Sequence, residues 1–229
     1  MIKFIAHRGN GTNKYVENTA SALLGSLELK EVDGVELDIR MTRDKQFVIY
    51  HDFLIKDDRL PIRNISSLTL AEVKKYRLNN KDVHVDTLVD FLDKVKSKKK
   101  IMIEIKEESN NYDELLVILN SILEKYKHLN ILVFSFNYNL MNTWQKKYPE
   151  YNSGLLISDL VNNNYLNNTF DFIALSYHYL DKWDFKKITY FWTINSTSKL
   201  KNIINKHKDC FVITNKPVKL FNYLDEVSK

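Results

Sequence analysis

The chain has 229 residues, of which 44% are hydrophobic and 28% charged, and its formal net charge at pH 7 is +5. This composition is typical of a globular protein and excludes a largely disordered chain, and the length suits one domain over residues 1–229. No apolar run approaches the roughly 18–20 residues of a membrane-spanning helix, so we expect no membrane span.

In chain order, short apolar runs rich in β-branched residues alternate with longer amphipathic segments. The runs predict strands over 2–6, 32–39, 101–105, 131–135, 153–157, 170–175, 189–193 and 210–214. The segments predict helices over 17–30, 86–98, 111–127, 138–148, 158–166, 196–207 and 217–227. Such alternation is typical of βαβ units, and eight strands predict a (β/α)8 TIM barrel of the α/β class. A doubly wound sheet would need a glycine-rich first turn, and the chain has only five glycines.

One apolar run, QFVIY at 46–50, has no place among the parallel strands. Only three residues, RDK at 43–45, separate it from DIRMT at 38–42, which continues the second strand. This connection is too short for a parallel crossover and predicts an antiparallel hairpin. A turn centred between Asp44 and Lys45 would place Asp38 opposite His51. Residues from about 40 to 85 then form an insertion, with a short helix over 67–76 where TLAE has the spacing of a capping box.

In barrels of this kind the active site lies at the carboxyl ends of the strands. The first three predicted strands end in His7-Arg8, Glu36-Leu37-Asp38 and Glu104-Ile105-Lys106. Side chains two residues apart on a strand point to the same face, so the two charged residues within each of the last two motifs are predicted to face the same way. The hairpin returns His51 to this rim. His178 follows the sixth strand, and we expect it to face substrate or to be structural.

The types of residue at this rim indicate a chemistry. Three carboxylates would repel one another without a cation among them, and oxygen ligands suit Mg²⁺ or Ca²⁺. His7 and His51 provide a general acid and a general base, because imidazole titrates near neutral pH. Arg8 and Lys106 supply the positive charge that binds a phosphate. Together these groups predict cleavage of a phosphodiester.

The motifs that carry these residues resemble those of the glycerophosphodiester phosphodiesterase family. They are HRG at 7–9, ENT at 17–19, DGVELDIRMTRD with VIYHD at 33–52, LTLAEV at 68–73, IEIK at 103–106, SF at 135–136, FWTIN at 191–195 and ITNKP at 213–217. They occur in the family's order over nearly the whole chain. Departures include Val16 for the usual proline before ENT and ITNKP for the commoner ITDRP.

The resemblance implies a (β/α)8 barrel with a small insertion after its second strand, and hydrolysis of a glycerophosphodiester to an alcohol and glycerol 3-phosphate. The metal ligands that it implies are Glu36, Asp38 and Glu104, for one divalent cation, Mg²⁺ or Ca²⁺. The acid/base pair that it implies is His7 and His51. The substrate contacts that it implies are Arg8 at the phosphate, Lys106 near the phosphate or metal, and Phe136 and Trp192 in the alcohol pocket.

Two other functions are weighed against this one. A phosphodiesterase acting on lysophospholipids or sphingomyelin would use the same histidines and acids, and a non-catalytic phosphodiester-binding protein would not need the histidine pair. Cys210 is the only cysteine and no secretory leader precedes the strand at Ile2, so we expect a cytoplasmic protein. The basic run KSKKK at 96–100 lacks interleaved aromatic residues, so we expect a small-molecule partner and no nucleic acid. The sequence specifies neither the oligomeric state nor the leaving alcohol.

Overall fold

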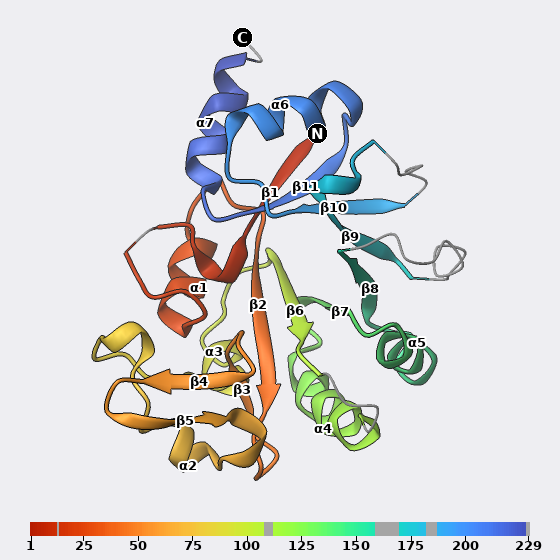
Figure 1. The fold of residues 1–229 in the computed structure, drawn as a ribbon. Coiled ribbons are helices and arrows are strands. Elements are labelled where there is room, and N and C mark those ends of the chain that lie inside the picture. The colour runs from red at the N-terminus through yellow and green to blue at the C-terminus, as the bar shows by residue number, and fades with distance from the viewer. Residues whose placement is uncertain (13, 108–111, 159–169, 182–186, 228–229) are drawn as a thin grey trace.

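The computed structural model describes residues 1–12, 14–107, 112–158, 170–181 and 187–227, and its core is a closed parallel barrel (Figure 1). Eight barrel strands lie in the described residues: β1 (Ile2–Ala6), β2 (Gly34–Met41), β6 (Lys100–Ile105), β7 (Asn130–Ser135), β8 (Asn152–Ile157), β9 (Phe172–Ser176), β10 (Ile188–Trp192) and β11 (Cys210–Thr214). The barrel closes because β1 pairs in parallel with both β11 and β2. The predicted (β/α)8 barrel is confirmed.

The helices pack outside the strands and mostly begin where a side chain caps them. They are α1 (Ala20–Leu27), α3 (Leu88–Leu92), α4 (Asp113–Leu123), α5 (Tyr138–Lys147), α6 (Thr197–Lys206) and α7 (Pro217–Val227). Thr19 accepts a hydrogen bond from the Ala22 amide, so α1 begins later than the predicted residue 17. α3 is shorter than the predicted 86–98, and Thr87 and Asp90 form its capping box. The helix predicted over 158–166 lies almost wholly outside the described residues.

The barrel interior is filled largely by aromatic side chains. Tyr190 stacks on Phe211 with ring centroids 4.3 Å apart, and Phe172 contacts both Phe134 and Tyr190. Gly154 leaves the space that the Phe172 ring fills, because a Cβ at that position would lie 2.3 Å from the ring. A separate apolar layer joins the outer face of the barrel to the helices and contains the buried Trp144.

The predicted hairpin is present, but its register differs by one residue. β3 (Phe47–Ile49) pairs antiparallel with β2, with Arg40 opposite Val48, so Asp38 faces Tyr50 and not His51. The turn is centred on Asp44: the Thr42 amide donates to the Gln46 carbonyl, and Lys45 has a φ of 62°. A three-residue loop that ends in a left-handed residue is a standard hairpin connection and accounts for the shift.

A second hairpin, absent from the sequence-based prediction, follows in the insertion. It consists of β4 (Leu54–Asp57) and β5 (Leu60–Asn64), and Figure 1 draws it beside β2 and β3. Ile55 packs with Val48 of β3 and with α2 (Leu70–Val73), whose predicted capping box of Thr69 and Glu72 is present. The insertion therefore has a small apolar core of its own, attached to the barrel through β3.

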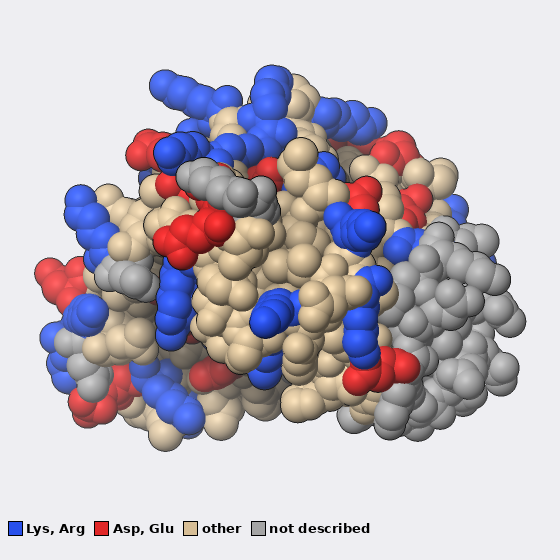
Figure 2. Space-filling view, turned by 90° about the horizontal axis from the view of Figure 1, so that it is seen from above, with Lys and Arg blue, Asp and Glu red and all other residues tan. Residues whose placement is uncertain are grey.

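Charge is spread over the surface. Figure 2 shows lysine and arginine side chains interspersed with acidic ones on the face seen from above. The net charge of +5 is therefore not gathered into one basic stripe on the described part of that face. Among the described residues, no helix has the length and apolar content that crossing a bilayer requires.

We predict that Gly154→Ala destabilises the barrel by about 1–3 kcal/mol, because the added methyl group overpacks the interior against Phe172. Urea unfolding followed by circular dichroism measures this change. Adding Phe172→Leu to the same chain should recover part of the loss, and an unchanged unfolding midpoint in Gly154→Ala would contradict the packing argument.

Candidate active site

The carboxyl ends of β1, β2 and β6 and the segment after β3 meet at one rim of the barrel. A cavity of about 160 Å³ opens there. Its walls include eight of the residues identified from the sequence: His7, Arg8, Glu36, His51, Glu104, Lys106, Phe136 and Trp192. Asp38 is buried beside them, with its Oδ1 3.2 Å from the Nζ of Lys106. All nine candidate residues therefore lie at the same rim.

A larger cavity of about 590 Å³ adjoins the first and shares Arg8 and His51 with it. The loop at 16–18 lines one part of this groove, and the insertion lines another with Lys56 and Ile62. The insertion thus forms a wall of the approach to the rim.

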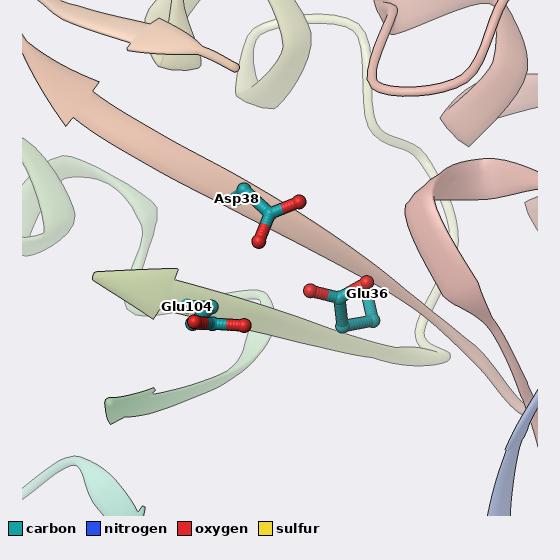
Figure 3. Close-up of side chains that lie close together, drawn as sticks. All are labelled: Glu36, Asp38 and Glu104. Atoms are coloured by element: carbon teal, nitrogen blue, oxygen red, sulfur yellow. The ribbon is translucent and has the colours of Figure 1, made fainter. Parts of the chain in front are cut away.

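Three carboxylates form the centre of the site (Figure 3). Asp38 of β2 is the register partner of Glu104 on β6, and Glu36 lies two residues before Asp38 on the same face. One oxygen from each lies within 4.8 Å of the others, and all three residues are buried. Burial, together with the charges of Asp38 and Glu104, raises the pKa of Glu36 well above its usual range. Burial and Asp38 raise the pKa of Glu104 to about 8.

This donor set fits a hard divalent cation. Carboxylate oxygens are the ligands that Mg²⁺ and Ca²⁺ prefer, and a cation relieves the repulsion that raises these pKa values. The three side chains come from two adjacent strands of the barrel, so their backbone positions are rigidly fixed. They could therefore hold one metal ion.

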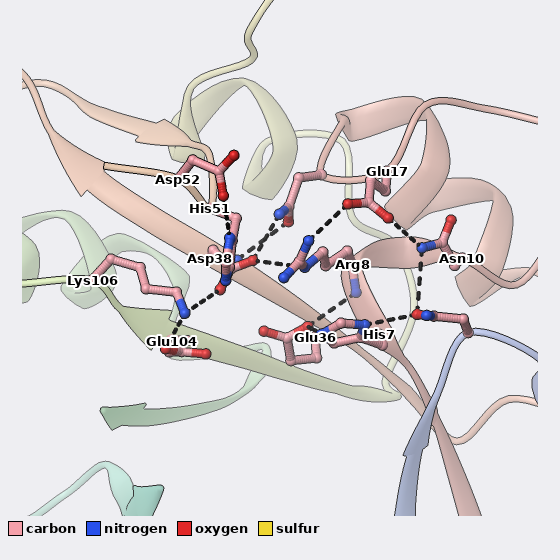
Figure 4. Close-up of polar contacts among 12 residues, drawn as sticks. His7, Arg8, Asn10, Glu17, Glu36, Asp38, His51, Asp52, Glu104 and Lys106 are labelled. Atoms are coloured by element: carbon pink, nitrogen blue, oxygen red, sulfur yellow. Dashed lines mark hydrogen bonds and ion pairs between the residues drawn. The ribbon is translucent and has the colours of Figure 1, made fainter. Parts of the chain in front are cut away.

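Two basic side chains offset part of the negative charge (Figure 4). Lys106 Nζ lies 2.5 Å from Glu104 Oε1 and 3.2 Å from Asp38 Oδ1. Arg8 Nε lies 3.3 Å from Asp38 Oδ2. Although burial opposes it, the charges of Lys106 and Arg8, with the neighbouring His51 ring and a hydrogen bond from Asn18, lower the pKa of Asp38 below its usual value. Asp38 is therefore the carboxylate of the three that stays ionised most readily.

The HRG motif forms a sharp turn after β1. Arg8 and Gly9 have φ values of 53° and 71°, and a Cβ on Gly9 would lie 2.7 Å from the backbone of Ala22. Only glycine meets both conditions at this position. The turn directs the backbone N–H of Arg8 at Glu36 Oε2, 3.0 Å away.

The two histidines both line the smaller cavity and have different partners. His7 Nδ1 is 2.7 Å from Asn215 Oδ1, and its Nε2 is 3.9 Å from Glu36 Oε2. Burial, followed by the charge of Arg8, lowers the pKa of His7 below 6.5. His51 Nδ1 is 2.7 Å from Asp52 Oδ1, and this imidazole lines both cavities. One ring is therefore held by a neutral amide and the other by a carboxylate.

Several polar residues of the site had no role in the sequence-based interpretation, among them Asn18, Glu17 and Asn215. Asn18, with a φ of 53°, donates to Asp38 Oδ2 at 2.7 Å, and Glu17 accepts from Arg8 Nη1 at 2.8 Å. All three lie in the quoted motifs ENT and ITN, which was the available signal. His178 is exposed and, among the described residues, lines a separate cavity with Tyr177.

A comparison with protein families identifies the relatives of this chain. The glycerophosphoryl diester phosphodiesterase family matches residues 7–189, which include both histidines and all three carboxylates. The chain belongs to this family.

Other members of the glycerophosphoryl diester phosphodiesterase family support the assignment. A glycerophosphodiester phosphodiesterase from Caldanaerobacter subterraneus subsp. tengcongensis is 29% identical over 160 residues, covering 66% of this chain and 65% of that protein. One from Bacillus altitudinis is 27% identical over 171 residues, covering 70% of this chain and 69% of that protein. The match to the first therefore spans slightly less than two thirds of that relative's length.

Two solved structures of phosphodiesterases have the same fold. A glycerophosphodiester phosphodiesterase from Parabacteroides distasonis aligns with a TM-score of 0.84 and 21% identity, covering 100% of this chain and 98% of that one. A phosphodiesterase from Oleispira antarctica, solved in complex with the product sn-glycerol-3-phosphate, aligns with a TM-score of 0.81 and 20% identity, covering 97% and 96%. At these identities the likeness concerns the barrel.

We predict that the carboxylate repulsion makes the metal-free protein lose stability as the pH rises. The pKa of Glu104 is raised from 4.5 to about 8 in the folded state, so its contribution is fully present below the unfolded value and is lost as the pH passes through the folded one. In EDTA, the melting temperature should fall more between about pH 5 and 8 for the wild type than for Glu104→Gln. The exposed Glu114→Gln is the matched control, and parallel curves for all three proteins would contradict the prediction.

Proposed function

We propose that the chain hydrolyses glycerophosphodiesters to an alcohol and glycerol 3-phosphate, using a divalent cation and two histidines. The observation that carries the proposal is the cluster of three buried carboxylates at one rim with two imidazoles, Arg8 and Lys106. The family membership and the product complex of the Oleispira protein support the choice of substrate class.

The proposed metal ligands are Glu36, Asp38 and Glu104, and their all-oxygen character favours Mg²⁺ or Ca²⁺. When bound, such an ion supplies positive charge that neutralises a phosphate oxygen and lowers the barrier to attack on phosphorus. The carboxylates would hold the ion at the rim that His7 and His51 also line.

Two cations and two aromatic rings account for binding of the substrate. The guanidinium of Arg8 can donate to two phosphate oxygens at once, and Lys106 adds a second positive charge. Phe136 and Trp192 pack edge to face with centroids 5.6 Å apart, and both line the smaller cavity. Their rings provide an apolar wall for the carbon atoms of the substrate.

The different partners of the histidines suggest different roles. The Oδ1 atom of Asn215 can only accept, so His7 carries its hydrogen on Nδ1 and keeps a lone pair on Nε2, as a general base requires. Asp52 accepts from His51, and a carboxylate partner suits an imidazole that delivers a proton to the leaving alkoxide. His51 borders the groove of about 590 Å³, which gives the leaving alcohol a way out.

A second candidate function is hydrolysis of lysophospholipids, with the same catalytic groups. It is favoured by apolar side chains on the insertion, where Phe53, Leu54 and Ile62 are exposed and Ile62 lines the groove. An acyl chain would lie against these residues. Lysophosphatidylcholine tested beside the glycerophosphodiesters separates the two candidates.

We predict release of glycerol 3-phosphate from glycerophosphocholine or glycerophosphoethanolamine, loss of release in EDTA, and recovery with Mg²⁺ or Ca²⁺. Glu36→Gln should raise the metal concentration needed for half-maximal rate by at least about tenfold, because one carboxylate ligand becomes an amide. A coupled glycerol 3-phosphate dehydrogenase assay follows the product. Absence of release with either metal would contradict the proposal.

We also predict that His7→Ala and His51→Ala each lower kcat by about 10²–10⁴-fold, because each removes a proton-transfer group. Melting temperatures should stay close to that of the wild type. His178→Ala, at an exposed histidine that lines a separate cavity, is the control and should keep full activity. Rates near wild type in both catalytic variants would remove the acid/base assignment.

A further inference from the structure

A chain of side-chain hydrogen bonds connects Arg8 to His7 by a route around the barrel mouth (Figure 4). Arg8 Nη1 donates to Glu17 Oε1 at 2.8 Å, and Asn10 Nδ2 donates to Glu17 Oε2 at 2.8 Å. The same Asn10 amide nitrogen lies 3.5 Å from Asn215 Oδ1, which in turn accepts from His7 Nδ1 at 2.7 Å. This series of hydrogen bonds thus begins at Arg8, a proposed phosphate contact, and ends at His7, the proposed base.

The direction of these hydrogen bonds, from donor to acceptor, is fixed because one residue of the series is a carboxylate. Hydrogen bonds from Asn10 and Arg8, against the opposing effect of burial, lower the pKa of Glu17 below its usual value. An ionised carboxylate only accepts, so Asn10 must turn its NH₂ group toward Glu17. The second hydrogen of that NH₂ group points to Asn215, which must therefore present its carbonyl oxygen. Two donors, from Asn10 and His7, converge on that oxygen.

The backbone of Asn215 is held by a residue other than those that contact its side chain. Its N–H donates to Asn195 Oδ1 at 2.8 Å, and the same oxygen accepts from Thr214 Oγ1 at 3.2 Å. Pairing of β1 with β11 places Thr214 beside Ala6, one residue before His7. Asn215 is therefore fixed in position by the barrel, while its amide orientation depends on Asn10.

We propose that Glu17, Asn10 and Asn215 are positioning residues that together hold His7 with its hydrogen on Nδ1 and its lone pair on Nε2. The inference deepens the proposed function and rests on it, since the Nδ1–H tautomer matters only if His7 acts as the base through Nε2. An amide has a donor and an acceptor side that can exchange, unlike a carboxylate. An asparagine at 215 therefore needs a neighbour that orients it, and Asn10 with Glu17 meets that need.

The decisive variant is Glu17→Gln. It should reverse the donor and acceptor roles along the series of hydrogen bonds, while the side chain at position 17 keeps its size. Arg8 requires an acceptor, so the introduced amide would turn its oxygen to Arg8 and its NH₂ group to Asn10. Asn10 and then Asn215 would rotate by half a turn, and Asn215 would present its NH₂ group to His7. Nδ1 would become an acceptor, and the hydrogen of His7 would move to Nε2.

The experiment is ¹⁵N NMR of the imidazole nitrogens at about pH 8, where His7 is neutral, together with steady-state kinetics. His7→Gln identifies the His7 signals. We expect the Nδ1–H pattern in the wild type, the Nε2–H pattern in Glu17→Gln, and a fall in kcat of about 10-fold or more in that variant. KM should also rise, because Arg8 loses one of its two anionic partners and keeps only Asp38.

Adding Asn215→Asp to Glu17→Gln separates the effect on the His7 tautomer from the effect on Arg8 and KM. A carboxylate at 215 accepts in any orientation, so the double variant should regain the Nδ1–H pattern and most of kcat while KM stays raised. Asn215→Leu has no acceptor and should show mixed tautomers with lowered kcat and little change in KM. Asn222→Leu, at an exposed position of α7, is the control and should match the wild type.

The proposal is overturned if wild-type His7 carries its hydrogen on Nε2, or if Glu17→Gln leaves the Nδ1–H pattern unchanged. It is also overturned if Asn215→Leu keeps both tautomer and kcat. The NMR readout does not depend on turnover. A wild type with the expected tautomer and no hydrolysis would therefore overturn the proposed function, while the positioning role of Glu17, Asn10 and Asn215 would remain supported.

Discussion

The rim of this barrel depends on the mutual repulsion of three buried carboxylates. Parallel pairing of β2 with β6 places Asp38 beside Glu104, and the two-residue period of β2 adds Glu36 to the same face. Like charges in a buried site strongly disfavour ionisation, so positive groups must be nearby. Lys106 contacts Asp38 and Glu104, while Arg8 contacts Asp38 through its side chain and Glu36 through its backbone N–H. The positive φ values of the HRG turn accompany this direction of the Arg8 N–H.

The positive groups compensate the three carboxylate charges unequally, and this difference bears on function. Asp38 receives both cations and an amide from Asn18, so its pKa falls, while those of its two neighbours rise. A divalent cation held by the three carboxylates would take over the compensation that Lys106 and Arg8 provide. Both side chains could then turn their charge toward a phosphate. The same residues would thus serve the metal-free and the metal-bound rim with different partners.

Much of this arrangement was predictable because barrel strands have a strong local signature. Apolar runs and the charged pairs at their ends determine which residues face the rim, whatever the details of the loops. The hairpin register was not predictable, because it depends on a φ of 62° at Lys45, a conformation that few lysines adopt. The β4–β5 hairpin was missed because it depends on tertiary contacts, among them the apolar cluster that holds Ile55 with Val48 and the hydrogen bond from the backbone N–H of Arg77 to Asp57.

Asn215 illustrates a different limit. A neutral amide at a strand end has no charge pattern, and its partner His7 is 208 positions away in the sequence. Closure of the barrel between β1 and β11 is what makes the two residues neighbours. The same closure brings Asn10 and Glu17, in the loop after β1, next to the end of β11. A strand pairing that first serves the stability of the barrel thereby also determines which nitrogen of the histidine faces the carboxylates.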